Sequence, residues 1–587
     1  MLSRRESSVK HPSKDYGYGA RSLVHGRAWV PPGGRMGEKG LAPRNVWLGE
    51  SKGSSNAAPC MCAMSAAQPN DHRLDHLVVI MFENRSFDNL LGYLYKPGEV
   101  PTFEGVPAVA PRNPVATDAP DSAEGPVAVH PATSMASPYP DPGEEYPHVN
   151  TQLFRTVSPP SNRFVDPDDM LQPYNAPSPT GVPTMSGFVD DYVSAFRGQI
   201  GRMPTRKEYS QIMACYTPDQ LPVMSGLARG FATFDHWFCE VPSQTYPNRS
   251  FFHAATSSGF VLNGHPPGKF AVKNRAKTLF NLLEEAKKSW AVYIDPAQIL
   301  SATGLIHARP LAPFFADHFR TIFDFYEEAR AGNLPNYAFI EPNMFHPHTD
   351  MHPHSGSRLT QVLPKPDTLI GGERLLCAVY EAVKSQPGGG GSDWSNTALL
   401  VTFDEHGGTF DHVSPPPTVA PDASSGEQDF RFDRLGIRIP TILISAWVDP
   451  MTVVTGQYQS TSVIRTVCEW WGLPGPLTKR DTNAPSFLPI LSRGSLRTVA
   501  ELPVVAPRTP SLLQEVESEV EKVAEDLETD LESLERDLLA DALAHESSES
   551  GRPPRADASS LSHREAHEHF NRIAQSYFPG IANGRRH

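Results

Sequence analysis

The sequence contains few cysteines and no long apolar run. Six cysteines in 587 residues are too few for a disulfide scaffold, and one residue rather than two separates Cys60 from Cys62, unlike a zinc or redox CxxC pair. No stretch of about 18 apolar residues is present, so no membrane-spanning helix is predicted. The N-terminus, MLSRRESSVKHPSKDYG, has no apolar segment like that of a secretory signal. We therefore expect reduced thiols and a cytoplasmic location, or secretion if the start of the chain is misassigned.

The sequence also lacks a concentration of positive charge. Its formal net charge is −14, but thirteen acidic and two basic residues between Glu515 and Glu546 account for most of it. No sustained run of lysine and arginine is present, which argues against a nucleic-acid-binding groove. Proline, in contrast, is abundant, with 58 residues or about twice the usual share. Because proline is excluded from helix interiors and central strands, this composition predicts a loop-rich globular protein.

Short apolar segments that alternate with helical patterns predict an α/β fold. Leu77–Phe82 and Leu399–Phe403 are continuously apolar, as in strands buried on both faces of a parallel sheet. Further strands are expected at 290–294, 337–342 and 441–447, and helices at 277–289 and 373–385. Strands that alternate with helices predict an α/β sandwich with a mostly parallel sheet.

Composition divides the chain into three parts. Residues 1–70 are polar, rich in Gly, Pro and Ser and without periodicity, which predicts a disordered extension. A large domain is expected at 71–500, with a Pro-rich insertion at 98–147. An acidic, helical and partly disordered tail is expected at 501–587. Its apolar stripe predicts a helix packed on its own domain, with a coiled-coil homodimer as the alternative; the stripe consists of Val516, Val520, Val523, Leu527, Leu531, Leu534 and Leu538.

Oxygen ligands follow two of the predicted buried strands. Glu83-Asn84 comes directly after the first, and Asp404-Glu405 directly after another. Ligands of open α/β sheets bind outside the carboxyl ends of the strands, so these side chains meet if the two strands are parallel neighbours. Repulsion among three carboxylates favours a divalent cation, and oxygen ligands favour Mg²⁺, Ca²⁺ or Mn²⁺, with zinc also accepted. The alternative is that Glu83 and Asp404 cap helices or pair with arginines.

Histidines are concentrated in two segments, HPHTDMHPH and DEHGGTFDHV. Beside a hard-metal site, a histidine can stabilise a phosphoryl oxyanion or protonate a leaving group. The segments contain His346, His348, His352, His354, His406 and His412. For His346 and His354, a surface-loop position is the preferred interpretation.

Thr245 is a candidate nucleophile. In VPSQTYPNRSFFHAATSSG, residues 241–259, it precedes a turn that leads into a predicted helix. A hydroxyl at a helix start beside a metal can be activated, and backbone amides left unpaired there favour bound phosphate. The alternative is that Thr245 is only the N-cap of the helix.

Four motifs, in this order, resemble one family. They are ENRSFDNLLGY (83–93), TYPNR (245–249), the Asp-x-His-Pro of DMHP (350–353) and TFDEHGGTFDHVSPP (402–416). The combination resembles the phosphoesterase family that includes bacterial and plant non-specific phospholipases C and a bacterial acid phosphatase. The resemblance spans roughly residues 74–495, which makes the large domain a phosphoesterase catalytic domain. It implies a three-layer, alkaline-phosphatase-like α/β/α sandwich and metal-dependent cleavage of phosphate esters.

The resemblance also implies roles for individual residues. One divalent metal ion is the expected cofactor, with Glu83, Asn84, Asp404 and Glu405 as its ligands. Thr245 would form a phospho-enzyme intermediate, His352 would contact the phosphate, and His148 of DPGEEYPHVNTQ would be a second catalytic histidine. The His-Pro motif lies farther than usual from Gly372-Glu373, so His348 or His354 can take the place of His352. The residues expected to bind phosphate or substrate are Asn248, Arg249, His348, His406 and His412.

Phospholipase C-type cleavage of a phosphodiester is the expected function, because the threonine form of TYPNR resembles that branch. The alternatives are an acid phosphatase acting on monoesters and a non-catalytic protein whose acidic helix recruits a basic partner. A sulfatase is disfavoured because the Cys/Ser-x-Pro-x-Arg motif is missing from the sequence. The expected partner is a phosphate-ester substrate, including phospholipid, and not a nucleic acid.

Overall fold

The computed structural model describes residues 74–178, 181–264, 266, 268–345, 348–353, 368–385, 391–423, 426–509, 533–579 and 581. The predicted N-terminal extension at 1–70 lies outside the described residues. So do His346, His354 and the apolar stripe from Val516 to Leu531. Within the described ranges, no helix is both long enough and apolar enough to cross a membrane.

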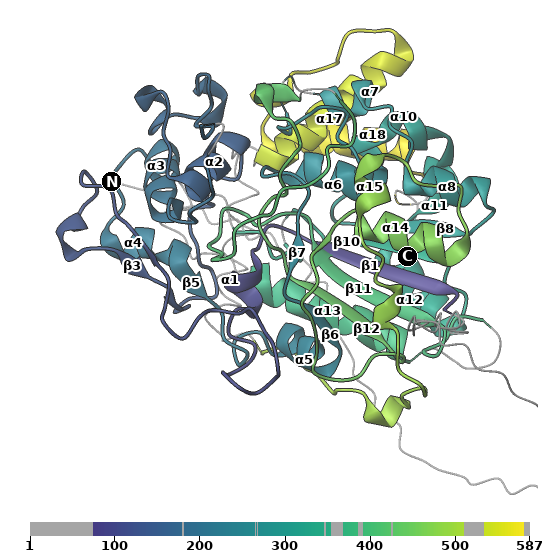
Figure 1. The fold of residues 1–587 in the computed structure, drawn as a ribbon. Helices are drawn as coiled ribbons and strands as arrows, with labels where there is room; N and C mark the ends of the chain where they lie inside the picture. The colour runs from purple at the N-terminus through teal and green to yellow at the C-terminus, as the bar shows by residue number, and fades with distance from the viewer. Residues whose placement is uncertain are drawn as a thin grey trace, which may run out of the picture. The chain divides into compact units, whose positions relative to one another are not determined.

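An eight-stranded sheet forms the centre of the described unit (Figure 1). Every neighbouring pair is parallel except the two that involve β12 (Thr441–Ser445), which is antiparallel to β11 (Thr397–Phe403) and β6 (Ala232–Phe234). The prediction of a mostly parallel sheet is therefore confirmed. In spatial order the strands are β13 (Thr452–Val454), β6 (Ala232–Phe234), β12 (Thr441–Ser445), β11 (Thr397–Phe403), β1 (His76–Phe82), β10 (Tyr337–Glu341), β8 (Trp290–Ile294) and β9 (Phe319–Thr321).

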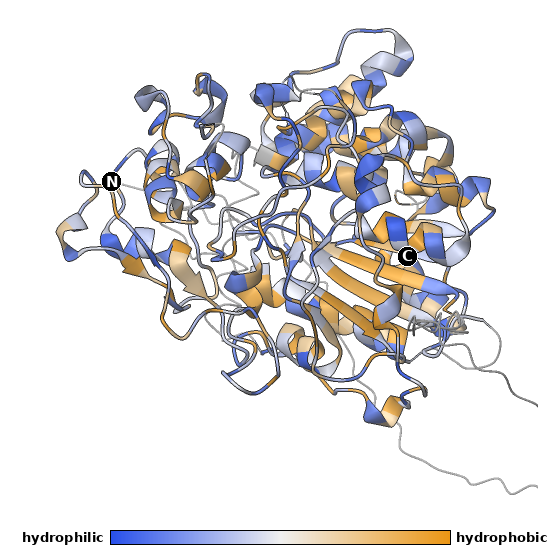
Figure 2. Ribbon diagram, in the orientation of Figure 1, coloured by the Kyte–Doolittle hydropathy of each residue, from blue (hydrophilic) through white to orange (hydrophobic). Residues whose placement is uncertain are grey.

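The central strands are apolar on both faces. All seven residues of β11 are buried, as are six of the seven in β1, and Figure 2 shows the strands of the sheet as hydrophobic along their length. Because successive side chains of a strand point to opposite faces, such a strand needs cover on both sides.

Helices supply that cover on both faces of the sheet. On one face α5 (Pro222–Gly230), α13 (Thr368–Lys384) and α12 (Ile322–Ala331) pack next to one another. On the other lie α14 (Ser462–Trp471), α6 (Thr245–Ala254) and α8 (Leu279–Glu285). The predicted helices at 277–289 and 373–385 correspond to α8 and α13. The predicted α/β/α sandwich is confirmed.

A smaller lobe, residues 112–215, lies beside the carboxyl ends of the strands and is called the insertion lobe below. Its apolar cluster includes Val149, Leu153, Phe188 and Tyr192 and is separate from the main core. In the lobe α2 (Tyr146–Phe154) packs on α3 (Phe188–Ile200). The lobe contains β2 (Arg112–Asn113), β3 (Val127–Ala128), β4 (His130–Pro131), β5 (Ala214–Cys215), α2 (Tyr146–Phe154), α3 (Phe188–Ile200) and α4 (Arg206–Ser210).

Two helices near the C-terminus belong to the main core. α17 (Ser533–Ser550) packs against α7 (Lys269–Lys273), α9 (Ala302–Ile306) and α18 (His563–Tyr577). Leu538, the last residue of the predicted stripe, is fully buried in the same cluster as the sheet, together with Leu539. The described part of the acidic helix thus packs on its own domain, and the homodimer stays a prediction.

Candidate functional site

The ends of β1 and β11 bring four polar side chains together. The strands are parallel neighbours in which Phe82 lies opposite Phe403. The residues that follow them, Glu83-Asn84 and Asp404-Glu405, are all buried. Gly407 makes the close approach of the two turns possible, because a Cβ atom there would lie 2.0 Å from the Asn84 carbonyl oxygen.

Several oxygens of these four side chains have no hydrogen-bond donor. Within the described part of the chain, Glu83 Oε2, Asn84 Oδ1 and Glu405 Oε1 accept no hydrogen bond, and Glu83 Oε1 meets only the guanidinium of Arg249. Buried polar groups are normally satisfied. Carboxylate and amide oxygens are the ligands that hard divalent cations prefer, so these residues fit the expected metal ion.

The guanidinium of Arg249 pairs with two of the three carboxylates. Arg249 Nη2 lies 2.9 Å from Glu83 Oε1, and its Nε lies 3.3 Å from Asp404 Oδ2. Burial, with the charges of Asp404 and Asp350, raises the pKa of Glu83 despite Arg249. Burial likewise raises the pKa of Asp404 to about 6 and, with Asp404, raises the pKa of Glu405. One arginine does not balance three buried carboxylates, which is the electrostatic situation of a cation site.

Thr245 lies on the same helix as that arginine. It is the first residue of α6 and follows the N-cap Gln244. Residues four apart share one face of a helix, so Thr245 and Arg249 lie on the same face of α6. Because Arg249 pairs with carboxylates at the ends of β1 and β11, this face points toward those ends. No hydrogen bond joins the Thr245 hydroxyl to any described residue, whereas the N–H of Tyr246 donates to Asn263 Oδ1 at 2.8 Å.

Asn248 shapes the loop that precedes Thr245. Its Oδ1 accepts hydrogen bonds from the backbone N–H groups of Glu240 and Val241, and its Nδ2 donates to the backbone carbonyls of Val241, Ser243 and Gln244. All five bonds are made with backbone, so in this structure the side chain fixes the loop that presents Thr245.

The insertion lobe adds two carboxylates that the sequence patterns did not single out. Asn84 Nδ2 donates to Glu144 Oε2 at 2.7 Å. His352 lies between the two acids, with Nε2 3.8 Å from Glu144 Oε2 and Nδ1 3.9 Å from Asp141 Oδ1. Their only sequence signal is the acidic DPGEE turn before His148, which has no periodicity to reveal its position in space.

His148 is held protonated by a carboxylate of the same lobe. Its Nδ1 lies 2.8 Å from Asp191 Oδ1. Burial opposes protonation, but the charge of Asp191 outweighs it and raises the pKa of His148 to about 9. Its Nε2 makes no hydrogen bond with a described residue. The neighbouring Glu145 Oε1 lies 3.5 Å from Gln244 Nε2, beside Thr245, so α2 borders the start of α6.

His348 and His406 border the group from two sides. His348 Nδ1 lies 3.2 Å from Asp350 Oδ2, and the carbonyl of Asp350 accepts the N–H of Glu83. Burial opposes the effect, but the charge of His348 lowers the pKa of Asp350. His406 is fully buried next to Glu405, and burial lowers the pKa of its imidazole to about 3.

His412 lies in a different cluster. Its Nδ1 lies 2.6 Å from Asp88 Oδ2, and Arg438 pairs with both Asp88 and Asp411. The structure therefore brings together the other predicted site residues that it describes, but places His412 with Asp88 and Arg438.

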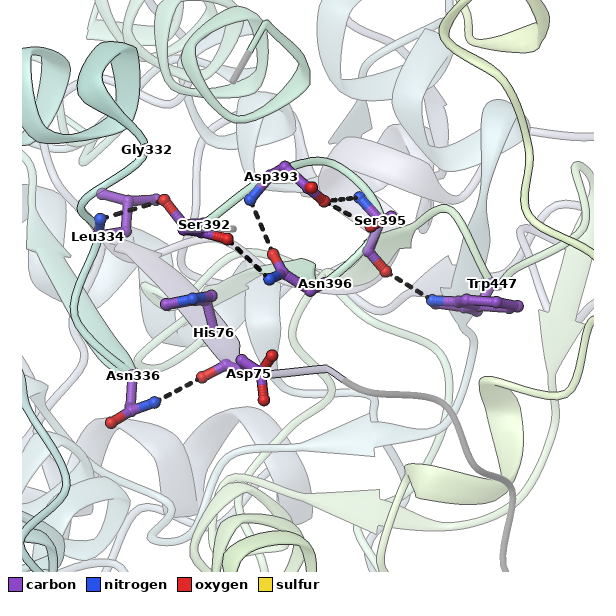
Figure 3. A pocket seen from close by; sticks show the side chains of 11 residues that line it. Asp75, His76, Gly332, Leu334, Asn336, Ser392, Asp393, Ser395, Asn396 and Trp447 are labelled. Carbon is purple, nitrogen blue, oxygen red and sulfur yellow. Dashed lines mark hydrogen bonds between the residues drawn. The ribbon is translucent and has the colours of Figure 1, made fainter. Parts of the chain in front are cut away.

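A pocket of about 660 Å³ lies at the opposite ends of the strands (Figure 3). It is lined among others by Asp75, Asn336, Ser395 and Trp447. Asn336 donates to the Asp75 carbonyl, and Trp447 Nε1 donates to the Ser395 carbonyl. Because open α/β sheets bind ligands at the carboxyl ends of their strands, this pocket is not the candidate active site.

Comparison with known proteins agrees with the geometry. The family model described as the phosphoesterase family matches residues 74–474. Non-specific phospholipase C3 of Arabidopsis thaliana is 31% identical over 454 residues, which cover 74% of this chain and 76% of that protein. Non-hemolytic phospholipase C of Pseudomonas aeruginosa is 26% identical, over 69% of this chain and 54% of that protein.

Among solved structures, a protein in the alkaline phosphatase superfamily from Vibrio parahaemolyticus aligns with 47% of this chain and 64% of its own, at 10% identity and a TM-score of 0.27. The resemblance first noted in four short motifs is confirmed by the match over most of the chain, and with it the enzyme class, a hydrolase of phosphoric esters. The chain belongs to the phosphoesterase family.

Proposed function

We propose that this protein is a metal-dependent phospholipase C-type enzyme that cleaves a phosphodiester through a phospho-threonine intermediate. One observation carries the proposal: Arg249, which follows Thr245 by four residues on α6, pairs with Glu83 and Asp404 at the ends of β1 and β11. The similarity to non-specific phospholipases C supports a diester over a monoester substrate.

Thr245 is the nucleophile in this proposal. A divalent cation held by Glu83, Asn84, Asp404 and Glu405 would supply the positive charge that lowers the pKa of a nearby hydroxyl and stabilises phosphoryl oxygens. The Thr245 hydroxyl loses its proton to solvent, and its alkoxide attacks phosphorus in line while the P–O bond to the leaving alcohol breaks. Arg249 balances part of the negative charge that surrounds the reaction.

In this proposal one histidine protonates the leaving alcohol and another contacts the phosphoryl group. Nε2 of His148, which Asp191 keeps protonated, donates a proton to the oxygen of the leaving alcohol. His352 contacts a phosphoryl oxygen. Water then attacks the phosphorus of the phospho-threonine, which restores the Thr245 hydroxyl and releases the phosphorylated head group.

The test compares two chromogenic substrates, p-nitrophenyl phosphorylcholine and p-nitrophenyl phosphate, each with and without chelator. We expect chelator-sensitive cleavage of the diester. Thr245→Ala should lower kcat at least about 10³-fold while the protein still binds metal, and Thr245→Ser should retain part of the activity because it keeps a hydroxyl.

Cleavage of the monoester alone would make the protein a phosphatase. Full activity of Thr245→Ala would remove the phospho-threonine from the mechanism, and turnover unaffected by chelator would remove the metal ion.

A further inference from the structure

We propose that Gln152 is a positioning residue of the active site, which holds His148 and His406 in fixed orientations at the same time. It lies on α2, its side chain is buried, and its amide makes three hydrogen bonds to three separate parts of the site. The catalytic meaning of this inference rests on the proposed function, but its test includes a measurement that needs no turnover.

One carboxylate joins Gln152 to His148. The two residues are four apart on α2 and therefore share one face of the helix. Asp191, on α3, uses one oxygen for each of them: Oδ1 lies 2.8 Å from His148 Nδ1, and Oδ2 accepts a hydrogen bond of 2.8 Å from Gln152 Nε2. A carboxylate paired with Nδ1–H orients an imidazole, and Gln152 prevents this carboxylate from rotating away.

A second hydrogen bond of Gln152 fixes the backbone that packs against the ring of His148. Gln152 Nε2 also donates to the carbonyl of Gly143 at 2.7 Å. A Cβ atom at Gly143 would lie 2.3 Å from His148 Cγ, so the glycine lies directly against the imidazole. Through these two bonds, the amide of Gln152 holds both the carboxylate partner of the ring and the backbone that contacts it.

The third hydrogen bond reaches the residues that follow β11. The two acceptors, Asp191 and the Gly143 carbonyl, set the orientation of the amide, because only its NH₂ group can face them. The oxygen of Gln152 therefore accepts a hydrogen bond of 2.8 Å from His406 Nε2. A neutral imidazole has one N–H, so this bond places the proton of His406 on Nε2. Its Nδ1 then faces Oε2 of Glu405, an expected metal ligand, at 3.2 Å.

Gln220 is a matched control for Gln152 within the same chain. It is a half-buried glutamine that donates to the carbonyl of Ala132 at 2.9 Å and accepts from the N–H of Thr217. Neither partner is a site residue, whereas Gln152 bonds to side chains that adjoin a general acid and a metal ligand. Side chains that orient such groups typically contribute about 10–100-fold to activity or to metal affinity.

The kinetic test compares Gln152→Met with Gln220→Met in the full-length protein. Methionine keeps the length of the side chain but makes none of the three hydrogen bonds. We expect Gln152→Met to lower kcat on phosphatidylcholine about 10–100-fold with little change in KM. The loss on p-nitrophenyl phosphorylcholine should be smaller, because p-nitrophenolate leaves without a proton. Gln220→Met should keep the wild-type kcat on both substrates.

The spectroscopic test uses protein labelled with ¹⁵N-histidine and saturated with Mg²⁺, which is diamagnetic. In the wild type we expect His406 to carry its proton on Nε2 and His148 to keep an Nδ1–H that exchanges slowly with water. In Gln152→Met the proton of His406 should be distributed over both ring nitrogens. The His148 Nδ1–H should exchange at least about 10-fold faster, as expected for the loss of one hydrogen bond. Gln220→Met should show the wild-type signals.

Several outcomes would overturn the role of Gln152. A wild-type His406 protonated on Nδ1 would do so even if Gln152→Met does not fold. So would unchanged histidine signals or an unchanged kcat in Gln152→Met, an equal loss on both substrates, or an equally large loss in Gln220→Met. If the histidine signals behave as expected but no phosphate ester is cleaved, the proposed function fails and the orientation of the two histidines by Gln152 stands.

Discussion

Arg249 is the residue on which the charge balance of the site depends. It is fully buried and faces Glu83 and Asp404. Removing one partner of a buried ion pair leaves an uncompensated charge, which typically costs about 3–5 kcal/mol.

We therefore expect Arg249→Met to lower the free energy of unfolding of the metal-free protein by about 3–5 kcal/mol, measured by urea denaturation. Added Mn²⁺ should restore part of the loss, because the cation binds the same carboxylates. Arg249→Lys, which keeps a positive charge, should lose less. Equal stability of Arg249→Met and the wild type without metal would show that the carboxylates are balanced in another way.

His148 can be tested through the leaving group of the substrate. p-Nitrophenolate leaves without a proton, whereas the alkoxide of a glycerol needs one. We expect His148→Gln to change kcat little on p-nitrophenyl phosphorylcholine but to lower it about 10²–10⁴-fold on a phospholipid. In the wild type, activity on the lipid should fall as pH rises through about 9, where His148 loses its proton. An equal loss on both substrates would contradict a role as general acid.

The predictability of the site differs from residue to residue. Glu83 and Asp404 are predictable from the sequence because each directly follows an apolar strand, and the end of the strand fixes the position of the residue. Asp141 and Glu144 follow no such element. They reach the site only because the insertion lobe has its own apolar core, and a Pro-rich sequence without periodicity does not show where such a lobe will pack.

At the scale of elements, the contact between α17 and α7 is unusually close. A Cβ atom at Gly268, which has a φ of +77°, would lie 2.2 Å from Ala544 Cβ. The N-cap of α7 and the middle of α17 thus meet with no room for a methyl group.

Gly268→Ala should therefore lower the free energy of unfolding by about 1–3 kcal/mol through the clash with Ala544. This loss adds to the one that the positive φ of residue 268 causes by itself. Gly259→Ala is the matched control, because that residue has a φ of +85° with no atom within 4 Å and bears the backbone strain alone. Ala544→Gly added to Gly268→Ala should recover the difference, measured by chemical denaturation. No recovery would mean that α17 does not lie against α7.

The elements that sequence patterns predict well are those of the sheet. β8 spans the predicted residues 290–294, and β10 and β12 differ from their predictions by one or two residues at one end. The two-residue strands of the insertion lobe have no comparable signal, since pairs such as β2 and β3 are set by tertiary packing.

For the whole molecule, stability should depend on pH through two carboxylates of α17. Burial raises the pKa of Asp537 to about 7, and burial with the charge of Asp537 raises the pKa of Asp541. Asp168 and Glu145 add negative charge near Asp537, and Lys269 opposes them. The folded state thus holds protons that an unfolded chain releases near pH 4.

The free energy of unfolding should therefore fall as pH rises from about 4 through 7. Asp541→Asn should flatten this slope and stabilise the protein at pH 8 by about 1–3 kcal/mol, measured by denaturation at each pH. Asp557→Asn, at an exposed position, is the control and should keep the wild-type slope. An unchanged slope in Asp541→Asn would assign the pH dependence to other groups.

The packing of α17 on α7 and α9 also has a consequence for how the protein is made. A ribosome completes every strand of the sheet before it reaches α17, because the last of them, β13, ends at Val454. Until α17 leaves the exit tunnel, the apolar surface against which Leu538 and Leu539 later pack is exposed to solvent on the nascent chain. A chaperone that binds apolar segments would bind the nascent chain at this surface, which is covered once α17 has packed.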